Sequence, residues 1–459
     1  MASSRAVDPS SAADAAALVA RLERVPFSRW HLRARLIVGS ATFFDAFDAL
    51  SLAFVLPVLV RLWQITPAQV GWLIATGYLG QFVGALVFGG LAERYGRVRS
   101  VAAATALMSA MSIACATSGS FATLLTLRLI QGIGVGGEMP VAAVYINELS
   151  KAHGRGRFFL LYELIFPIGL MMTGQIGALL VPTLGWQVMF LIGGIPGLVV
   201  TALLLRLPES PRWLISKGRL ADADNVIREI EASAATRPRT HEPRTPEPRT
   251  ADPGSRAGAG ELLAPLYRGR TATVWALWAC AYFITNGLNN WMPTLYSSVY
   301  HLDLAQALRA GTLTNVAQVV VLLGCAFAID RIGRRRWTVA GFAAGAALLA
   351  MLGTFAAHSV VSVIALVTVS YGIVGSVNAV LYLYTPEIYP TRMRAIATGA
   401  ATCWLRLASA AGPVLVGYLV AKRGTGAVFL MFAAAGVVGA VAARAMLETR
   451  NRSLEELAP

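Results

Sequence analysis

The chain has 459 residues, of which 56 % are hydrophobic and only 14 % are charged. An ordinary soluble domain has about a quarter charged residues, so this composition excludes that class and indicates a protein that lies in a lipid bilayer. The net charge of +15 does not indicate a nucleic-acid partner, because the basic residues lie in short turns between apolar segments.

Twelve apolar segments follow one another along the chain, and each is long enough for a transmembrane helix, which takes roughly 20 residues. They cover about residues 36–61, 69–91, 100–119, 122–147, 158–182, 186–206, 271–297, 309–329, 338–356, 359–384, 396–420 and 426–446. The four cysteines lie inside these segments without the spacing of a metal site or a disulfide pair. We expect no cleavable signal peptide, because the first apolar segment is long enough to span.

Basic residues in the turns predict the topology. The turns after segments 2, 4, 8 and 10 are rich in lysine and arginine, whereas the turns after segments 3, 5 and 9 contain neither residue. Because lysine and arginine gather in cytoplasmic loops, both termini are expected in the cytoplasm. We therefore predict a multi-pass protein of a bacterial inner membrane.

The connection between segments 6 and 7 has a different composition. An amphipathic, charged helix is expected from Pro208 to Glu231, followed by a polar stretch with EPRT repeats from Thr236 to Gly260. Such a composition is typical of a disordered linker. The predicted parts are an N-terminal arm (1–35), a first bundle (36–206), a cytoplasmic loop (207–265), a second bundle (266–446) and a tail (447–459).

An internal repeat relates the two halves. The pairs Glu93 and Asp330, Gly96 and Gly333, and Arg97 and Arg334 are each separated by 237 residues. Two later arginine pairs keep the same separation: Arg155 with Arg392, and Arg157 with Arg394. One half-chain used twice predicts an all-α membrane protein of 12 transmembrane helices in two pseudo-symmetric six-helix bundles.

Several motifs resemble signatures of the major facilitator superfamily. The turn that begins at Gly89 resembles G-x-x-x-D-R-x-G-R with Glu93 in place of the usual Asp, LRLIQGIGVGG resembles R-x-x-x-G-x-G-x-G, and PESPRWL resembles the sugar-porter signature. FFDAFDALSLAFVLP, GGEMPVAAVYINE and TPEIYPTRMRA are similar to bacterial metabolite–proton symporters, in particular niacin and aromatic-acid carriers. The resemblance implies a central site that opens alternately to each side of the membrane.

Acidic residues inside the apolar segments are the candidate proton site. Asp45 and Asp48 share one face of segment 1, and Glu138 of segment 4 lies at a similar depth. A charge at the bilayer centre costs about 2.5–3.5 kcal/mol, and three neighbouring carboxylates should not all be ionised. We expect one of the three to carry the coupled proton, with Arg128 as a switchable partner. The alternative is a permanent structural ion pair.

Arg406 in segment 11 is the leading candidate for binding a substrate, because a guanidinium matches a carboxylate at two points. The alternative is a packing residue. Further candidates are amides, aromatic side chains and one acid on segments 5, 7 and 10: Asn286, Asn289, Asn290, Trp291, Tyr282, Glu163, Gln175, Asn378 and Tyr382. Hydrogen bonding between helices is the alternative role for the amides. The glycines from Gly132 to Gly137 are expected to let helices approach closely.

Acid–base pairs in the basic turns are the candidate cytoplasmic gate. Pairs of Glu93 with Arg97 and of Asp330 with Arg334 would form latches that break when this side opens. A second set would pair Glu148 with Arg155 or Arg157, and Glu387 with Arg392 or Arg394. The alternative is a solvated charged face that only sets the topology.

These residues favour the proton-coupled uptake of a small organic acid, with niacin or a related aromatic carboxylate as the first choice. A sugar or polyol symporter is the alternative that PESPRWL favours, although the Q-Q-x-x-G pattern of sugar porters is absent from segment 7. Drug or metabolite efflux and a transporter-like membrane sensor stay open. We expect no enzyme activity, no cofactor, no metal and no ATP use, since no G-x-x-x-x-G-K loop is present. The expected partners are the solute, protons and the bilayer, and the protein is expected to be a monomer.

Overall fold

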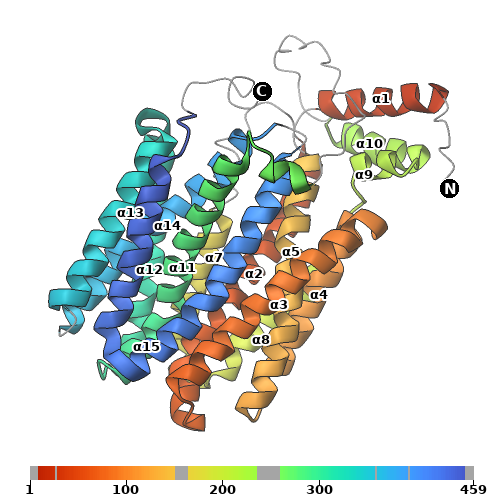
Figure 1. Cartoon of the computed structure of the whole chain (residues 1–459). Helices are drawn as coiled ribbons and strands as arrows, with labels where there is room; N and C mark the ends of the chain where they lie inside the picture. Colours follow the sequence, from red (N-terminus) through yellow and green to blue (C-terminus); the bar gives the residue numbers. More distant parts are fainter. Residues whose placement is uncertain are drawn as a thin grey trace.

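Long α-helices that run side by side make up the protein (Figure 1). The computed structural model describes residues 9–25, 28–149, 164–234, 259–356, 359–390 and 393–449, and within these ranges every regular element is a helix. The first half contains α2 (Arg29–Trp63), α3 (Pro67–Tyr95), α4 (Arg97–Ala116), α5 (Phe121–Glu148), α7 (Ile165–Leu184) and α8 (Gln187–Leu204). The second half contains α11 (Arg268–Ser298), α12 (Leu304–Ile332), α13 (Arg334–Met351) with the π-turn η2 (Leu352–Ala356), α14 (Val360–Glu387) and α15 (Arg394–Arg444).

Twelve membrane crossings fit these helices, which confirms the prediction from the sequence. Within the described ranges, 10 helices are long and apolar enough to cross a membrane. One of them, α15, has 51 residues and breaks at Gly424, where φ is +76° and ψ is −178°, so it makes two crossings. The twelfth is α11, whose 31 residues are long enough but include polar side chains that face the protein interior.

Some helices begin several residues before the apolar segment that predicted them. α2 begins at Arg29, ahead of the predicted start near residue 36, and the N–H of Ser28 donates to Nδ1 of His31 at this end. At the start of α3, Thr66 accepts a hydrogen bond from the N–H of Gln69, and Pro67 occupies the first helical position. These end contacts satisfy N–H groups that a helix leaves unpaired, so the helices extend beyond the apolar segments.

Close contacts between helices occur at glycines, as the sequence predicted. Gly132 of α5 lies against Gly80 of α3, where an added Cβ would be 3.1 Å from Cα of Gly80. The two halves meet in the same way, since a Cβ at Gly71 of α3 would be 2.6 Å from the carbonyl oxygen of Pro413 in α15. Larger side chains at these positions would push the helices apart.

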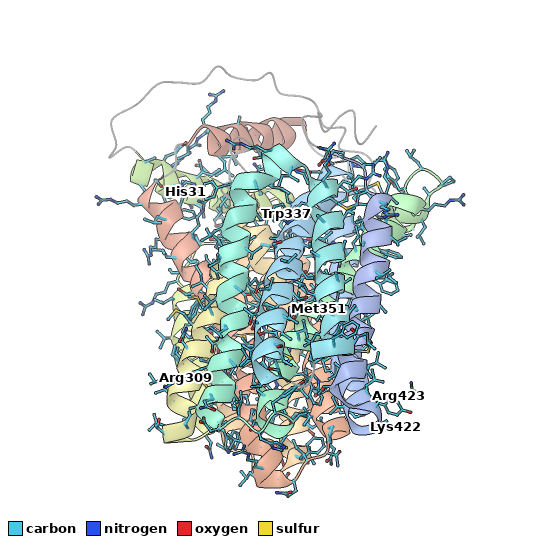
Figure 2. All side chains as sticks on the ribbon, turned by 90° about the vertical axis from the view of Figure 1, so that its left-hand side faces the viewer. His31, Arg309, Trp337, Met351, Lys422 and Arg423 are labelled. Carbon is cyan, nitrogen blue, oxygen red and sulfur yellow. The ribbon has the colours of Figure 1, made fainter. Side chains whose placement is uncertain are left out.

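Short helices gather at one end of the bundle, which we call the loop end, and the opposite end is the far end. α1 (Pro9–Arg24), α9 (Pro211–Ser216) and α10 (Leu220–Ala234) lie at the loop end (Figure 1). Figure 2 shows His31 toward the loop end, and Arg309, Lys422 and Arg423 at the far end. The single amphipathic helix predicted from Pro208 to Glu231 is two helices, with Gly218 between them at a φ of +73°. The EPRT repeats lie outside the described residues.

The α1 helix contacts α10, an association that the sequence did not predict. Arg21 donates to Asp224 over 2.6 Å and to Glu231 over 2.7 Å. Leu18 and Leu22 of α1 belong to the same buried cluster as Ile227 of α10. The N-terminal arm is therefore joined to the connection between the two halves.

We predict that Arg21→Ala releases α1 at neutral pH. The hydrogen bond from Arg21 holds the pKa of Asp224 below its usual value of 3.8. A carboxyl whose pKa is lowered in this way stabilises the docked form fully above pH 3.8. That stabilisation is lost as the pH falls through the lowered pKa of Asp224 in the docked form. Limited proteolysis of α1 should accelerate about two- to tenfold in the variant, as expected from the loss of two exposed ion pairs, and in wild type at acidic pH.

Arg24→Ala is the matched control, because Arg24 is an exposed arginine of the same helix. Equal cleavage rates for the Arg21 and Arg24 variants would contradict a docking role for Arg21.

Candidate binding site between the two halves

Three acidic side chains from α2 and α5 lie together inside the bundle. Asp45, Asp48 and Glu138 have exposed fractions of 3 %, 0 % and 0 %. Asp45 is within electrostatic reach of both other acids and of Arg406 from the second half. The three acids therefore lie together within the first half, and Arg406 approaches Asp45 from the second half.

The carboxylate of Asp48 is held by a chain of hydrogen bonds. Ser112 donates to Oδ1 over 2.8 Å, and Nε2 of Gln131 donates to Oδ2 over 2.8 Å. Arg128 in turn donates to Oε1 of Gln131 over 2.7 Å. The guanidinium fits beside Gly77, where an added Cβ would be 3.2 Å from Nη2. Arg128 and the Asp48 carboxylate are thus linked through Gln131.

Sequence reasoning did not identify Gln131 or Ser112. Gln131 follows Arg128 by three residues and therefore shares its helix face, which is a signal that the sequence carries. Ser112 lies on α4, and only the packing of α4 against α2 brings it to Asp48.

Asp45 and Glu138 have unused hydrogen-bonding capacity. Thr42 donates to Oε1 of Glu138 over 3.2 Å. Among the described residues, Oε2 of Glu138 and Oδ1 of Asp45 have no hydrogen-bond partner. These two oxygens can accept a proton, or a donor group of a bound molecule, without losing an existing hydrogen bond.

Arg406 of α15 contacts the first half and is within electrostatic reach of Asp45. Its exposed fraction is 6 %, and Nη2 donates to the carbonyl oxygen of Gly136 in the first half over 3.2 Å. Tyr282 and Tyr382 are within electrostatic reach of the guanidinium. Both tyrosines contact Trp278, one stacked with ring centres 5.6 Å apart and one edge-on at 4.5 Å.

We call Trp278, Tyr282 and Tyr382 the aromatic cluster. Both tyrosines are half-buried, whereas Trp278 is fully buried and was not among the predicted residues. A guanidinium next to aromatic rings suits a planar carboxylate, because the guanidinium can bind both carboxylate oxygens while the rings contact the planar part.

Two of the predicted amides on α11 lie at boundaries with other helices. Asn290 donates to the hydroxyl of Tyr78 in α3 over 3.0 Å, which joins the two halves. Asn286 donates to Ser409 of α15 over 2.6 Å. Asn286 therefore contacts α15 at Ser409, which follows Arg406 by three residues.

The remaining candidates on α11 are engaged within the second half. Asn289 and Asn315 exchange two hydrogen bonds of 3.3 and 3.2 Å. Trp291 donates to the carbonyl oxygen of Pro413 over 3.2 Å and is 2 % exposed. Hydrogen bonding between helices, the alternative role stated above, describes these two residues.

Three further candidates lie elsewhere. Asn378 donates to Thr285 over 3.1 Å, and its Oδ1 has no partner among the described residues. Gln175 is exposed on α7. Glu163 lies outside the described residues.

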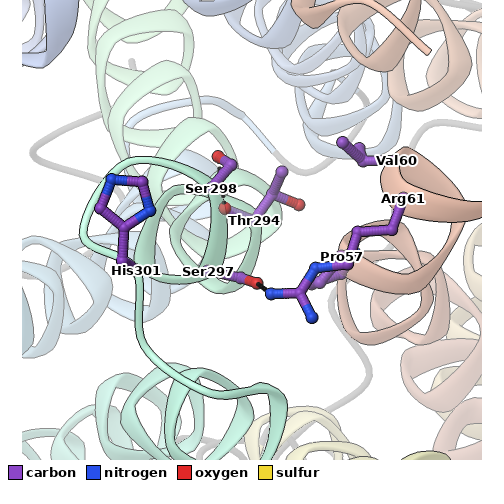
Figure 3. A pocket seen from close by; sticks show the side chains of 7 residues that line it. All are labelled: Pro57, Val60, Arg61, Thr294, Ser297, Ser298 and His301. Atoms are coloured by element: carbon purple, nitrogen blue, oxygen red, sulfur yellow. Dashed lines mark hydrogen bonds between the residues drawn. The ribbon is translucent and has the colours of Figure 1, made fainter. Parts of the chain in front are cut away.

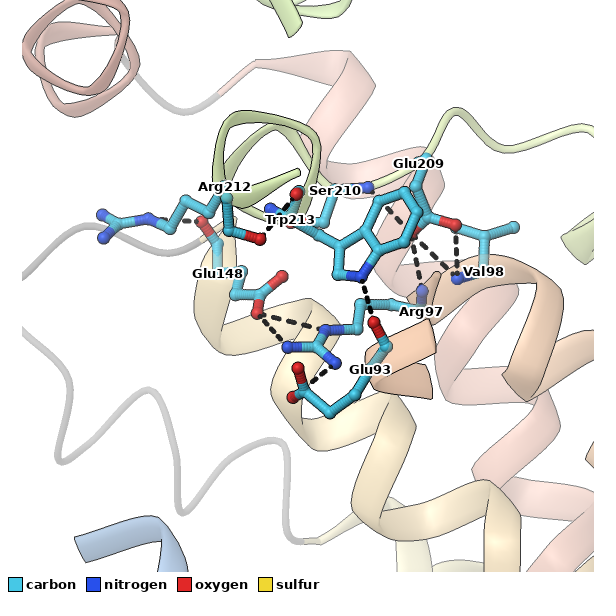
Figure 4. Close-up of polar contacts among 9 residues, drawn as sticks. Glu93, Arg97, Val98, Glu148, Glu209, Ser210, Arg212 and Trp213 are labelled. Carbon is cyan, nitrogen blue, oxygen red and sulfur yellow. Dashed lines mark hydrogen bonds and ion pairs between the residues drawn. The ribbon is translucent and has the colours of Figure 1, made fainter. Parts of the chain in front are cut away.

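A network of ion pairs holds the loop end of the first half (Figure 4). Arg97 pairs with Glu93 over 2.9 Å and with Glu148 over 3.2 Å. Glu209, from the motif PESPRWL, accepts hydrogen bonds from the N–H groups of Arg97 and Val98 over 2.8 and 3.1 Å. The network ties α3, α4 and α5 to the loop that follows α8.

The second half repeats this network. Arg334 pairs with Asp330 over 3.0 Å and with Glu387 over 3.3 Å. Glu448 accepts a hydrogen bond from the N–H of Arg334 over 2.9 Å, as Glu209 does for Arg97. The sequence did not suggest Glu209 or Glu448, because each acts from beyond the last helix of its half.

The predicted latches therefore lie inside each half. Glu148 forms an ion pair with Arg97, and Glu387 forms one with Arg334. The partners expected from the sequence, Arg155, Arg157 and Arg392, lie outside the described residues, as does the side chain of Arg394. Hydrogen bonds between the halves occur instead near the middle and at the far end, at Gly136, Tyr78 and Ser297.

Residues 38–459 match the model of the family described as "Sugar (and other) transporter". The "Niacin transporter NiaP" of Acinetobacter baylyi is 32 % identical over 445 residues, which cover 96 % of this chain and 99 % of the relative. The "4-hydroxybenzoate transporter PcaK" of the same organism is 28 % identical over 394 residues, with 85 % and 84 % covered.

Solved structures of xylose transporters have the same fold. The D-xylose–proton symporter aligns with a TM-score of 0.73 at 19 % identity, over 92 % of this chain and 99 % of that one. The partially occluded, inward open form of the xylose transporter XylE from E. coli aligns with a TM-score of 0.70 at 20 % identity, over 90 % and 97 %. At this identity, the similarity shows the fold alone.

We predict that Glu148→Gln destabilises the protein more than Glu93→Gln does, although both acids pair with Arg97. The side chain of Glu148 is 17 % exposed and that of Glu93 is 70 % exposed. Removing a partly buried partner of a charged group costs about 1–3 kcal/mol, whereas an exposed ion pair contributes about 0–1 kcal/mol. Thermal unfolding in detergent should show a Tm that is lower by several degrees for Glu148→Gln only. An equal loss in the two variants would contradict the structural role of the buried pair.

Proposed function

The chain belongs to the sugar (and other) transporter family of the major facilitator superfamily, and on this premise we propose that it carries a small aromatic carboxylate together with a proton. The observation that carries the proposal is the position of Arg406, between the aromatic cluster of its own half and the acids of the other half. Two relatives are named as transporters of niacin and of 4-hydroxybenzoate, which are aromatic acids, and their names support this solute class.

In the proposed complex, the carboxylate accepts hydrogen bonds from Arg406, and the ring lies against Tyr282 and Tyr382. Nε of Arg406 has no partner among the described residues, and Nη2 is used by a backbone carbonyl across the boundary. A bound carboxylate would take over both positions, because a charged acceptor forms stronger hydrogen bonds than a neutral carbonyl oxygen does. Asn286 and Asn290 would contact the polar atoms of the ring.

Proton coupling would follow from the charges around this site. An entering carboxylate adds a negative charge next to Asp45 and Glu138, which are buried and close to each other. A proton on the free oxygen of either acid would offset that charge in a region where water cannot screen it. The hydrogen-bonded chain from Asp48 through Gln131 to Arg128 would form a second charged pair, in which the guanidinium offsets the carboxylate while the halves move.

Alternating access would come from the two halves moving as bodies against each other. Strong ion pairs hold each half together at the loop end, whereas single hydrogen bonds such as Asn290 to Tyr78 join the halves. We propose that the loop end is cytoplasmic and that the protein acts as a monomer in the inner membrane. The bundles at 36–206 and 266–446 would be the moving bodies, and the arm (1–35), the loop (207–265) and the tail (447–459) would be cytoplasmic.

The test is uptake of labelled nicotinate, benzoate, glucose and xylose into proteoliposomes under an imposed pH gradient. We expect accumulation of one or both aromatic acids, and no accumulation of the sugars. Asp45→Asn and Glu138→Gln are expected to retain substrate exchange and to lose uphill accumulation in at least one case. The acid-to-amide control is Asp222→Asn, because the side chain of Asp222 on α10 is 50 % exposed. Accumulation of a sugar alone, or binding of an aromatic acid without flux, would contradict the proposal. Undiminished accumulation in both neutral variants would contradict the assignment of the proton site.

We predict a graded effect at Arg406. Arg406→Gln should weaken nicotinate binding about 10- to 100-fold, since a hydrogen bond to a charged group contributes about 1.5–3 kcal/mol. Arg406→Lys should lose less, because it keeps the charge but not the two-point geometry. Isothermal titration calorimetry of the purified variants measures the Kd for nicotinate in each, and nicotinamide is the neutral control ligand. If the affinity for nicotinate stays the same in Arg406→Gln, Arg406 is a packing residue.

A further inference from the structure

A polar cavity lies at the far end, at the boundary between the halves and separate from the central site (Figure 3). Its volume is about 250 Å³, and its walls come from α2 and α11 with the turn that follows α11. Pro57 and Val60 form an apolar side, and Arg61 and His301 contribute cationic or protonatable groups. Hydroxyl groups of α11 line the remainder.

One hydroxyl in this cavity has an unmet hydrogen-bonding requirement. Thr294 is 3 % exposed, and its Oγ1 has no hydrogen-bond partner among the described residues. Arg61, which has five N–H donors, donates to Oγ of Ser297 over 2.8 Å. Buried polar groups normally have partners, so the position next to Thr294 and Arg61 is suited to a bound polar group.

The exposed charges around the cavity are mostly positive. Arg309, Lys422 and Arg423 lie at the far end (Figure 2), as does Arg61 in the last turn of α2, and all four side chains are exposed. Within the described residues of this end, the one acid is Asp303, which caps α12 by accepting from the N–H of Gln306 over 2.8 Å. In the proposed topology this face is outside the cell, where loops normally carry few basic residues. A basic face raises the local concentration of small anions.

We propose that this cavity is an outer capture site for a small aromatic carboxylate. The proposal rests on the proposed function, because it assigns the same solute class to a second site on the same path. A volume of about 250 Å³ holds about eight waters at about 30 Å³ each, which is room for one ring with a carboxyl group. The ring would contact Pro57 and Val60, and the carboxylate would accept from Arg61 and Thr294.

Binding there would also affect the contact between the halves. Arg61 belongs to α2 and Ser297 to α11, so their hydrogen bond joins the two halves at the far end. A carboxylate that takes over the N–H groups of Arg61 competes with Ser297. Capture of the anion and loosening of this end are therefore linked.

Protection of a reporter cysteine tests the site. Ser298 lines the cavity and is exposed, so Ser298→Cys is open to a membrane-impermeant thiol reagent added on the far side, with the parent protein as the background. Nicotinate should slow labelling by the factor 1 + [L]/Kd, which is about threefold at twice the Kd, whereas neutral nicotinamide should not slow it. Adding Arg61→Gln should abolish the protection. Adding Arg309→Gln, an exposed arginine of the same face outside the cavity, should leave it unchanged.

The outcomes separate this proposal from the proposed function. Labelling that nicotinate does not slow, or protection that survives Arg61→Gln, overturns the capture site even if the protein transports nicotinate. Protection that depends on Arg61 supports the capture site even if flux is absent, and the absence of flux counts against the proposed function alone. A rise in the KM for uptake from the far side in Arg61→Gln, with an unchanged KM from the loop side, would further support the capture site.

Discussion

A buried guanidinium that faces buried carboxylates is the interaction on which the rest of the structure depends. Arg406 of α15 is within electrostatic reach of Asp45 of α2, which is also within reach of Glu138 of α5, and all three are almost completely shielded from solvent. Hydrocarbon cannot solvate such groups, so they must face the protein interior and one another. This requirement sets how α2, α5 and α15 are rotated, and it leaves their apolar faces for lipid. Under the proposed function, the same charges would form the chemistry of the central site.

The strength of the contacts differs within and between the halves. At the loop end, Arg97 and Arg334 each pair with two acids, and an acid from beyond the last helix caps the helix that follows each turn. Across the boundary, the contacts described above are single hydrogen bonds and close glycine contacts. These contacts would let each half keep its shape if its position relative to the other half changes, as the proposed function requires. The proposed alternation between two open states needs both properties.

Positive charge recurs along one proposed route. The far end presents Arg61 at a small cavity, and the interior presents Arg406 at the aromatic cluster, with α11 contributing to both sites. An anion that enters from the far end would move from one guanidinium to the other. The buried acids lie near the inner guanidinium, so under the proposed function a proton would be needed there and not at the entry. This order would couple the proton to the step that commits the solute to crossing.

The sequence by itself determined the 12 crossings, the two related halves and the identity of the buried charges, because hydrophobic length and repeat spacing are properties of the chain in order. The tertiary structure decided the partners. Glu148 pairs with Arg97, Asp48 reaches Arg128 through Gln131, and Asn289 pairs with Asn315. It also decided that α1 docks on α10. These pairings depend on how each helix is rotated about its axis and on how closely its neighbours pack. Neither property can be read from the local sequence around residues that are far apart in the chain.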